Sequence, residues 1–337
     1  MPRSLDAMRP EPSIGRRVRW GDMKVVALAG GIGAGKLLRG LVRAVEPEDV
    51  TAIVNTGDDF TLHGLRICPD LDSVTYWLGG RADRNRGWGR AGETFRTLEE
   101  VRALGGRAWF GLGDLDLATH LVRTQMLDEG RSLSEVTDHL RRSFGVRPRL
   151  LPMTDDGVET RIECVDDRGE RLDLHFQEYW VGRGARDEVK AVRFEGSARS
   201  APPPGALEAV EAADAILFCP SNPVVSVGPI LAVPGIREAL AARRDRAVGI
   251  SPIVAGAPVR GMADRLMPAV GLEVSALGAA SAYRGLLSGW VIDERDARMA
   301  PRIEGELGLG VAVTDTLMTD DRSAERVART ALGTVDR

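Results

Sequence analysis

The feature that most constrains the fold of this chain is a short apolar run that leads directly into a cluster of glycines. Residues 24–29 read Lys-Val-Val-Ala-Leu-Ala, and residues 30–36 read Gly-Gly-Ile-Gly-Ala-Gly-Lys. In α/β proteins, a strand that ends in glycines at the start of a helix exposes backbone N–H groups. These groups and the helix dipole bind phosphate. The stretch therefore predicts the start of a βαβ unit that holds a phosphate group.

The glycine run resembles two nucleotide-binding motifs but completes neither. Residues 30–36 have the GxxxxGK spacing of a P-loop, but Leu37 stands where that motif needs a Ser or Thr for Mg2+. The same glycines fall one residue short of the dinucleotide fingerprint GxGxxG. A tight turn that binds nothing is a third interpretation. The candidate phosphate-binding residues in this loop are Gly30, Gly31, Gly33 and Lys36.

Carboxylates gather after the second predicted strand, residues 51–55. They are Asp58, Asp59, Asp70 and Asp72. Mg2+ often takes one or two protein carboxylates and completes its shell with substrate phosphate oxygens. There it neutralises charge during phosphoryl transfer and lowers the pKa of an attacking hydroxyl. The alternative is local structure, in which these residues cap a helix or make a turn. We expect one or two of them to bind a metal ion.

The rest of the pattern predicts a doubly wound, Rossmann-like, mostly parallel sheet with a small α and β insertion. Helices are expected at 36–45, 71–78, 95–104, 114–129, 132–143, 206–213, 234–243 and from 322, and strands at 214–219, 247–250 and 310–314. Strand patterns at 149–153, 159–165 and 171–176, with a turn at 166–169, predict a partly antiparallel β insertion. The expected division is a first core part with a helical segment over 23–146, an insertion over 147–200 and a second core part over 201–337.

A second loop is expected to contact a ligand. The predicted strand at 214–219 leads into Pro-Ser-Asn-Pro-Val-Val-Ser at 220–226. In open parallel sheets, ligands bind beyond the carboxyl ends of the strands, so this loop should face the glycine loop. Ser221, Asn222 and Ser226 can hydrogen-bond a phosphate or a base edge, although such residues also make ordinary turns. Residues 251–256 form a similar strand exit in the same layer.

Composition excludes several classes of function. The 337 residues carry a net charge of -4, which argues against a general nucleic-acid binder. The three cysteines show no metal-ligand spacing, so neither a disulfide framework nor a structural zinc site is indicated. No apolar run approaches the ~18–20 residues that span a membrane. Residues 1–22 lack the apolar segment of a secretory signal and are expected to be a flexible extension. We therefore expect a cytoplasmic protein.

Seven blocks of the sequence carry a family resemblance. They are GGIGAGKLLRG at 30–40, VNTGDD at 54–59, ICPDLD at 67–72, RGWG at 86–89, GLGDLDLATHLVR at 111–123, PSNPVVS at 220–226 and SPIVAG at 251–256. Together they resemble the 2-phospho-L-lactate transferase family (CofD/FbiA) of coenzyme F-420 biosynthesis, from about Lys24 to beyond Asp293. At Ile32 many members carry threonine, so a hydroxyl contact there would be absent.

The resemblance implies a Mg2+-dependent transferase. Its members move a 2-phospholactyl or phosphoenolpyruvyl group from a guanosine diphosphate ester, and GMP leaves. The donor is lactyl-2-diphospho-5'-guanosine or enolpyruvyl-diphospho-5'-guanosine. The acceptor is the ribityl hydroxyl of the deazaflavin Fo, 7,8-didemethyl-8-hydroxy-5-deazariboflavin. A homodimer is also implied, with neither a nucleic-acid nor a membrane partner. The choice among lactyl, enolpyruvyl and glyceryl donors stays open.

The resemblance also implies roles for the residues singled out above. Asp58, Asp59 and Asp70 would be the catalytic carboxylates and candidate metal ligands, and they would hold Mg2+ or orient the attacking hydroxyl. The guanylyl diphosphate would lie between the glycine loop and the loop that carries Ser221, Asn222 and Ser226. Positioning and charge neutralisation would then supply most of the rate.

The deazaflavin ring needs a flat, apolar slot with a few polar anchors. Trp88, Thr94 and Asp59 are the residues expected to contact it, although Trp88 could instead pack against the core. Further along, Asp116, His120 and Arg123 have the spacing that places them on one helix face, with Asp114 nearby. They would either reach the diphosphate or form a structural ion-pair cluster.

Two other functions compete with the transferase. A YvcK-like regulator that binds a nucleotide sugar without transfer activity would share the glycine loop and the acidic loop. It would lack the Gly-Trp-Gly stretch at 87–89 and the pattern at 114–123. The second competitor is a nucleotide-binding module with no transfer activity.

Overall fold

A seven-stranded, all-parallel sheet forms the centre of the protein in the computed structural model, which describes residues 23–335. The strand order is β14-β13-β10-β9-β1-β2-β5. The strands are β1 (Val25–Ala29), β2 (Val50–Val54), β5 (Arg149–Pro152), β9 (Ala215–Phe218), β10 (Ala247–Ile250), β13 (Gly289–Asp293) and β14 (Gly310–Thr314). The predicted α/β Rossmann-like class is confirmed. The extension expected at residues 1–22 lies outside the described part of the chain.

Alternate residues of each strand pack into different layers, as a pleated strand requires. Along β1, Val26 and Leu28 join one apolar core, whereas Val25, Ala27 and Ala29 join the other. The first core is covered by α6 (Ala206–Glu211), α7 (Gly228–Ala232), α8 (Ile236–Ala242), α9 (Ala263–Ala269), α10 (Ala276–Ser281) and α11 (Ala300–Leu307). The second is covered by α1 (Gly31–Ala44), α2 (Pro69–Leu78) and α12 (Asp321–Val335). The sheet is therefore buried on both faces, which explains its nearly continuous apolar strands.

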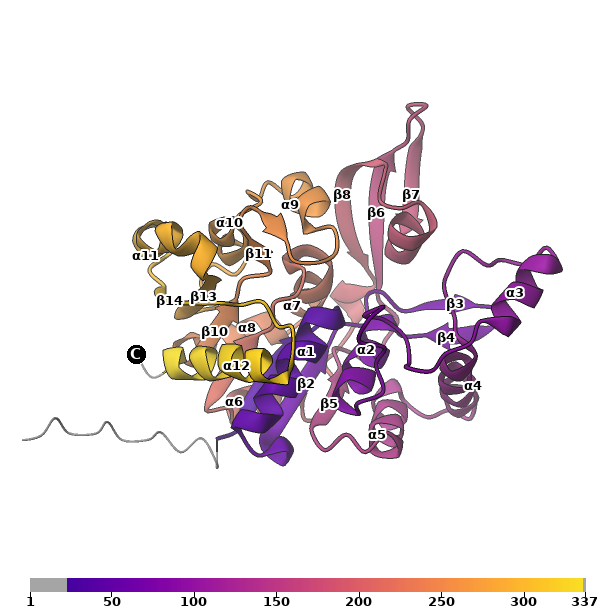
Figure 1. Ribbon diagram of the computed structural model, residues 1–337, viewed down its shortest axis with the longest axis horizontal. Helices are drawn as coiled ribbons and strands as arrows, with labels where there is room; N and C mark the ends of the chain where they lie inside the picture. The colour runs from indigo at the N-terminus through magenta and orange to yellow at the C-terminus, as the bar shows by residue number, and fades with distance from the viewer. Residues whose placement is uncertain (1–22, 336–337) are drawn as a thin grey trace, which may run out of the picture.

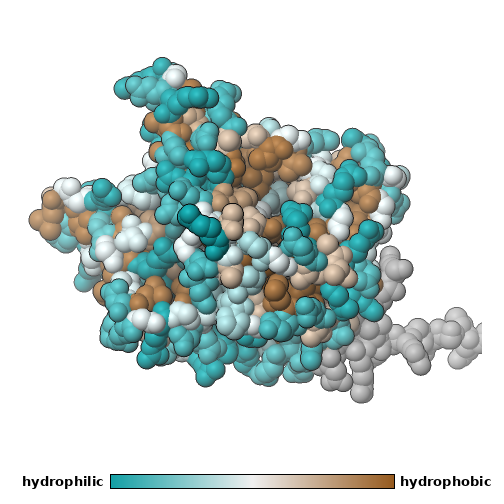
Figure 2. Space-filling view, turned by 180° about the vertical axis from the view of Figure 1, so that it is seen from behind, coloured by the Kyte–Doolittle hydropathy of each residue, from teal (hydrophilic) through white to brown (hydrophobic). Residues whose placement is uncertain are grey.

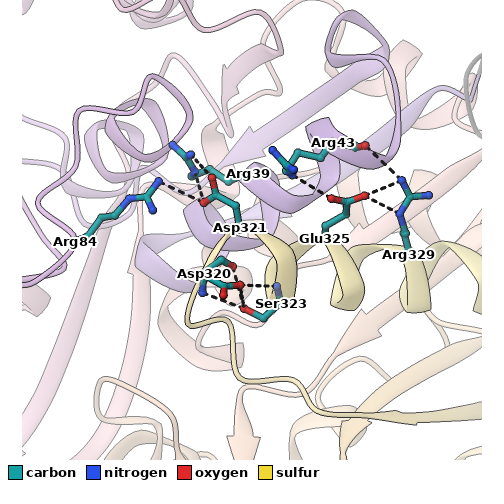
Figure 3. Close-up of polar contacts among 8 residues, drawn as sticks. All are labelled: Arg39, Arg43, Arg84, Asp320, Asp321, Ser323, Glu325 and Arg329. Atoms are coloured by element: carbon teal, nitrogen blue, oxygen red, sulfur yellow. Dashed lines mark hydrogen bonds and ion pairs between the residues drawn. The ribbon is translucent and has the colours of Figure 1, made fainter.

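Helix α12 lies beside α1, the helix that begins in the glycine run (Figure 1). Arg39 pairs with Asp321 at 2.6 Å, and Arg43 pairs with Glu325 at 3.0 Å (Figure 3). Arg84 reaches the same Asp321 carboxylate at 3.3 Å. These pairs connect the C-terminal helix to the helix that carries the glycines.

Two smaller units project from this core (Figure 1). The first contains the hairpin β3 (Phe60–Leu62) and β4 (Leu65–Ile67), with α3 (Arg96–Ala103), α4 (Asp114–Asp128) and α5 (Leu133–Ser143). The second is the antiparallel sheet β7-β6-β8, made of β6 (Glu159–Val165), β7 (Arg171–His175) and β8 (Glu188–Glu195). Seen from behind, its tip is hydrophilic, and apolar residues gather beside its base (Figure 2).

Several local predictions are confirmed. The turn predicted at 166–169 closes the hairpin of β6 and β7, and the helix expected at 132–143 is α5, which begins with a Ser132–Glu135 capping box. Short elements complete the fold: β11 (Ile253–Val254), β12 (Ala257–Pro258), the 3-10 helices Pro47–Asp49, Ser197–Arg199, Arg244–Arg246 and Glu294–Met299, and the π-helical turns Glu178–Gly182 and Pro223–Val227. Within residues 23–335 no single helix has the length and apolar character to cross a membrane. One pair, Pro223–Ala232 with Ile236–Ala242, reaches that length and hydropathy only across a 95° bend.

Three differences from the sequence predictions have physical causes. Helix α1 starts at Gly31 rather than near Lys36, because the glycines themselves form its first turn. The strand expected at 149–153 within the insertion instead pairs with β2 at the edge of the main sheet, so the antiparallel sheet begins only at Glu159. Strands β8 and β13 were not predicted. Strand β13 is buried along its whole length. Its apolar run, Trp290 to Ile292, is only three residues long, which is too short to be a clear strand pattern in the sequence.

Candidate active site

Two cavities open at the carboxyl ends of the parallel strands and meet at the glycine loop. The first, here called the strand-end cavity, has a volume of about 160 Å³ and is lined by the loops that follow β1, β9, β10 and β14. The second, here called the helix-lined cavity, has a volume of about 420 Å³ and lies against α2 and α4. Gly31, Ile32, Trp180 and Arg260 line both. The two cavities are therefore neighbouring compartments of one site.

The glycine loop packs too closely against other segments to carry side chains. Gly31 adopts a φ of +69°, a left-handed conformation that favours glycine. A Cβ on Gly30 would lie 2.6 Å from the Cβ of Ser226, and a Cβ on Gly33 would lie 2.5 Å from the Pro220 carbonyl oxygen. The glycines thus bring the start of α1 against the loop after β9.

The loop after β9 is hydrogen-bonded to the glycine loop, as the strand order predicts. The Ser221 hydroxyl donates to the Gly30 carbonyl at 2.8 Å and accepts from the Gly30 N–H at 3.3 Å. Asn222 lines the strand-end cavity, and its Oδ1 accepts the Val224 N–H at 2.9 Å. Ser226 packs behind Gly30 and does not line either cavity. Of these three predicted contacts, the structure places Ser221 and Asn222 at the cavity.

Two cationic side chains face the strand-end cavity. Lys36 lies at its wall, with its Nζ 5.6 Å from the ring centre of Trp77. Burial first, and the nearby positive charge of Arg260 second, lower the pKa of Lys36. Arg260 comes from the loop after β12 and donates its Nη2 to the Arg86 carbonyl at 2.8 Å. Two like charges in one cavity predict an anionic ligand between them.

Asp58 and Asp70 share one hydrogen-bond donor. The Asn55 amide donates to Asp58 at 2.8 Å and to Asp70 at 2.9 Å, and Gln177 donates to the other Asp58 oxygen at 3.1 Å. Asp70 lies at the wall of the helix-lined cavity, beside Gly31, while Asp58 is buried next to it. The two carboxylates predicted from the sequence therefore come together at the junction of the cavities.

The electrostatics of this pair fit a divalent cation. Burial raises the pKa of Asp70 to about 6, and the Asn55 and Gly31 hydrogen bonds oppose that rise. Burial also raises the pKa of Asp58, and the negative charge of Asp70 raises it further. Two buried carboxylates that destabilise each other's ionised form are the hard oxygen ligands that Mg2+ takes. Asp58 and Asp70 are thus the residues that could hold the metal ion.

Asp59 has different surroundings. It lines neither cavity, and its Oδ2 pairs with Arg66 at 3.5 Å, while its buried Oδ1 has no partner. Burial raises its pKa to about 7, opposed first by the positive charge of Arg66. Its catalytic, metal-binding and deazaflavin-binding roles stay predictions.

The helix-lined cavity has an aromatic wall. Trp88 lies there as predicted, 38% exposed, with the Arg86 guanidinium 4.7 Å from its ring centre. Tyr76, Phe110 and Trp180 complete the aromatic lining. Thr94 does not line the cavity, because its hydroxyl donates to Asp114 at the start of α4. The predicted contact between Thr94 and the deazaflavin therefore has no support in this arrangement.

A buried polar cluster forms the far wall of the helix-lined cavity. Asp72 on α2 forms a two-point ion pair with Arg123 on α4, and Arg123 also contacts His120. Asp116 accepts a hydrogen bond from the Tyr76 hydroxyl at 2.6 Å. Asp116, His120 and Arg123 share a helix face as predicted, but Asp114 caps α3 instead. The cluster lines the cavity on the α4 side, away from the strand-end cavity.

Sequence reasoning missed several residues of the site, among them Asn55, Tyr76 and Phe110 as well as the three that follow. Arg260 and Trp180 line both cavities, and Gln177 holds Asp58. Trp180 lies in the π-helical turn that follows β7, and Gln177 immediately precedes this turn, which has no local sequence signature. Arg260 follows the strand exit at 251–256, which was expected in the same layer. That exit is the sequence feature that indicates this part of the site.

The chain is similar to a known protein family and to named relatives over most of its length. The chain matches the family described as 2-phospho-L-lactate transferase CofD over residues 25–316. It is 51% identical over 313 residues to a phosphoenolpyruvate transferase of Kitasatospora aureofaciens, covering 92% of this chain and 97% of that protein. It is 52% identical over 312 residues to the protein of the same name from Streptomyces coelicolor, covering 92% and 97%.

The fold is also found among solved structures. A Bacillus halodurans protein of the UPF0052 family superposes with a TM-score of 0.62 at 20% identity, over 91% of this chain and 98% of that one. This likeness concerns the fold alone. The family match and the high identity over nearly the whole length carry the assignment: the chain belongs to the CofD family of 2-phospho-L-lactate transferases.

Proposed function

We propose that the protein transfers a phosphoenolpyruvyl group from enolpyruvyl-diphospho-5'-guanosine to the ribityl hydroxyl of Fo, with release of GMP. The 2-phospholactyl ester is the second candidate donor. The observation that carries the proposal is the meeting of two unlike cavities at Gly31 and Asp70. Relatives that share about half of the sequence are named phosphoenolpyruvate transferases, which favours the enolpyruvyl donor.

The strand-end cavity suits the guanylyl diphosphate. Backbone N–H groups at the start of α1 and the cationic side chains of Lys36 and Arg260 supply an anion site. The cavity continues past Ser221 and Ser251 to Thr316, so polar groups after three further strands are available to the nucleoside. Parallel sheets bind nucleotides at this edge.

The helix-lined cavity suits the deazaflavin. It is the larger of the two, and Trp88, Phe110 and Trp180 provide aromatic surfaces for a flat ring. With the ring there, the ribityl chain reaches toward Asp70 and Gly31. The attacking hydroxyl oxygen then bonds to the phosphorus of the transferred group, and the bond from that phosphorus to the bridging oxygen breaks. GMP leaves with the bridging oxygen, and the proton of the attacking hydroxyl is released to solvent.

Asp58 and Asp70 would hold the Mg2+ ion, because they are the paired carboxylates at the junction. When bound, the ion supplies charge neutralisation for the diphosphate. Asn55 and Gln177 fix the Asp58 carboxylate, and Asn55 also holds Asp70. Lys36 and Arg260, which both line the strand-end cavity, would contact the phosphates. The protein's contribution is therefore mainly positioning and fixed charge.

The test is a reaction with purified components. The protein is incubated with Fo, Mg2+ and either the enolpyruvyl or the lactyl guanosine diphosphate ester, and GMP and the product mass are measured. We expect GMP release that depends on Fo and on Mg2+, with a higher kcat/KM for the enolpyruvyl ester. Absence of GMP release with both donors would refute the proposed function. Faster turnover of the lactyl ester would correct only the choice of donor.

A further inference from the structure

The buried cluster of Asp72, Asp116 and His120 resembles a metal site by distance alone. One ligand atom from each residue lies within 4.8 Å of the others. His120 Nδ1 is 3.6 Å from Asp72, and His120 Nε2 is 3.7 Å from Asp116. The proposed reaction assigns no role to this cluster, although Asp116 and His120 both line the helix-lined cavity.

The hydrogen bonds of Arg123 exclude metal binding by this cluster. A guanidinium only donates hydrogen bonds, so the contact of 3.0 Å between Arg123 Nη1 and His120 Nδ1 makes Nδ1 an acceptor. Burial lowers the pKa of His120 to about 4, so the imidazole is neutral and carries its proton on Nε2. Both Asp72 oxygens are bound by Arg123 as well. The neutral His120 therefore offers no lone pair to a metal ion, because Nδ1 accepts from Arg123 and Nε2 carries the proton, and the charge of Asp72 is already paired.

This leaves His120 Nε2–H as a buried donor without a partner. His120 is 1% exposed, and its Nε2 is among the buried polar atoms that make no hydrogen bond. Its distance of 3.7 Å from Asp116 Oδ1 is too long for a hydrogen bond. An oxygen atom about 2.8 Å from both atoms would fill this gap. That atom must accept from Nε2–H and donate to the Asp116 carboxylate, which a hydroxyl group does.

The charges around the gap favour a neutral group over a phosphate. Asp70, Asp72 and Asp116 all line this cavity, and the positive charge of Arg123 is paired with Asp72. An anion placed between His120 and Asp116 would meet the Asp116 carboxylate, and the charge of Arg123 beside it is already paired with Asp72. A hydroxyl group in this gap would accept from His120 Nε2–H and donate to the Asp116 carboxylate.

We propose that His120 and Asp116 bind the polyol chain of the acceptor, and that Arg123 is the positioning residue that sets the His120 tautomer. The inference rests on the proposed function, because that function places the phosphorylated end of the polyol at Asp70. From Asp70, helix α2 leads along the same cavity wall past Ser73 to Tyr76, and α4 presents Asp116 and His120 opposite. The chain carbons between the reacting hydroxyl and the aromatic wall thus pass this pair.

The test compares two ligands and two isosteric substitutions. The ligands are Fo and an analogue with the same deazaflavin ring that carries a methyl group in place of the ribityl chain. In His120→Asn the side-chain amide can still accept from Arg123 but does not reach the Nε2 position. In His120→Gln the amide nitrogen reaches that position. His139→Asn, at an exposed position on α5, is the matched control. Binding is followed by deazaflavin fluorescence, and GMP release and thermal unfolding are measured in parallel.

We expect His120→Asn to weaken Fo binding about five- to tenfold, the effect of one lost hydrogen bond, without changing the affinity for the methyl analogue. His120→Gln should bind Fo within about threefold of the wild type, and His139→Asn should match it. Equal losses for both ligands, or unchanged Fo binding by His120→Asn, would overturn the proposal. So would Zn2+ or Mn2+ binding that depends on His120. The wild type could bind Fo more tightly than the methyl analogue, with a preference that depends on His120, and yet release no GMP. That result would refute the transfer reaction and support the polyol site.

Discussion

The two cavities of this protein are lined by different kinds of residues. The strand-end cavity is formed mainly by backbone and small residues at strand exits, such as Gly30, Gly33 and Ser221. The helix-lined cavity is formed mainly by large side chains from helices and loops, such as Tyr76, Trp88 and His120. Each construction matches the ligand that we propose for it. A diphosphate is bound by N–H groups and cations, and a ring with a polyol needs aromatic faces and paired donors and acceptors.

This difference predicts which substitutions should affect binding of the donor and which should affect binding of the acceptor. Residues of one cavity should affect one substrate, and residues at the junction should affect the transfer itself. The predictions that follow test this separation, beginning with the junction.

Asp70→Asn should have the largest effect. Asp70 borders the glycine loop and the helix-lined cavity and shares the Asn55 amide with Asp58. Loss of its charge should lower kcat/KM about a thousandfold, because transition-state charge and the metal ion both depend on it. Steady-state GMP release measures the change. Asp128→Asn, at an exposed position on α4, is the control. A decrease of less than tenfold in Asp70→Asn would contradict a catalytic role.

Gly33→Ala should impair only the strand-end cavity. The added Cβ would lie 2.5 Å from the Pro220 carbonyl oxygen and would push the two loops apart. We expect the KM for the guanosine diphosphate ester to rise about tenfold or more, the scale of a local overpacking strain. Fo binding, measured by fluorescence, should not change.

Gly305→Ala is the matched control for this substitution. Gly305 lies in α11, and a Cβ there meets nothing within 4 Å. It should leave both substrates unaffected. Equal losses of donor and Fo binding in Gly33→Ala would mean that the cavities are not separable.

Trp88→Ala should impair only the helix-lined cavity. Loss of an aromatic face that contacts the deazaflavin should weaken Fo binding about fivefold, and Trp88→Phe should recover part of this loss. The KM for the donor should stay at the wild-type value. Leu104→Ala, at a position that is 85% exposed, is the control. If Trp88→Ala changes only thermal stability, Trp88 is a packing residue rather than a ligand contact.

The smallest expected effect is on the pH dependence of stability. Burial first, and the charge of Asp72 second, raise the pKa of Asp116 to about 7, while Tyr76 and Arg123 lower it and Glu93 raises it. An unfolded Asp titrates near pH 4, so between about pH 4 and 7 the folded state holds a proton that the unfolded state has lost. This contribution to stability is complete below about pH 4 and is lost as the pH rises to about 7.

Asp116→Asn removes this contribution, because an amide does not titrate. Its Tm should therefore fall less steeply than that of the wild type across this window, by a difference on the order of 2 °C. Scanning calorimetry at several pH values measures it, with Asp128→Asn as the reference. Parallel curves for Asp116→Asn and the wild type would show that Asp116 is ionised in the folded protein at all of these pH values.

Much of the strand-end cavity could be predicted from the sequence. The apolar run before Gly30, the exit at 220–226 and the exit at 251–256 are local patterns, and parallel strands place their carboxyl ends at one edge. The helix-lined cavity could be predicted only in part. Trp88 was visible because it lies in an unusual glycine-rich stretch, whereas Trp180 lies in a π-helical turn without such a signal.

What the sequence by itself determined is therefore the α/β class, the position of the glycine loop and the family, since each depends on short stretches of neighbouring residues. Only the tertiary structure decided which carboxylates work together. Asp58 is held by Gln177, 119 residues away, and Ser221 meets Gly30 across 191 residues. The tertiary structure also gives the neighbouring aspartates different surroundings. Asp70 faces the junction of the cavities, Asp59 pairs with Arg66, and Asp72 pairs with Arg123. Four neighbouring aspartates look alike in a sequence, and burial and long-range partners give each its own chemistry.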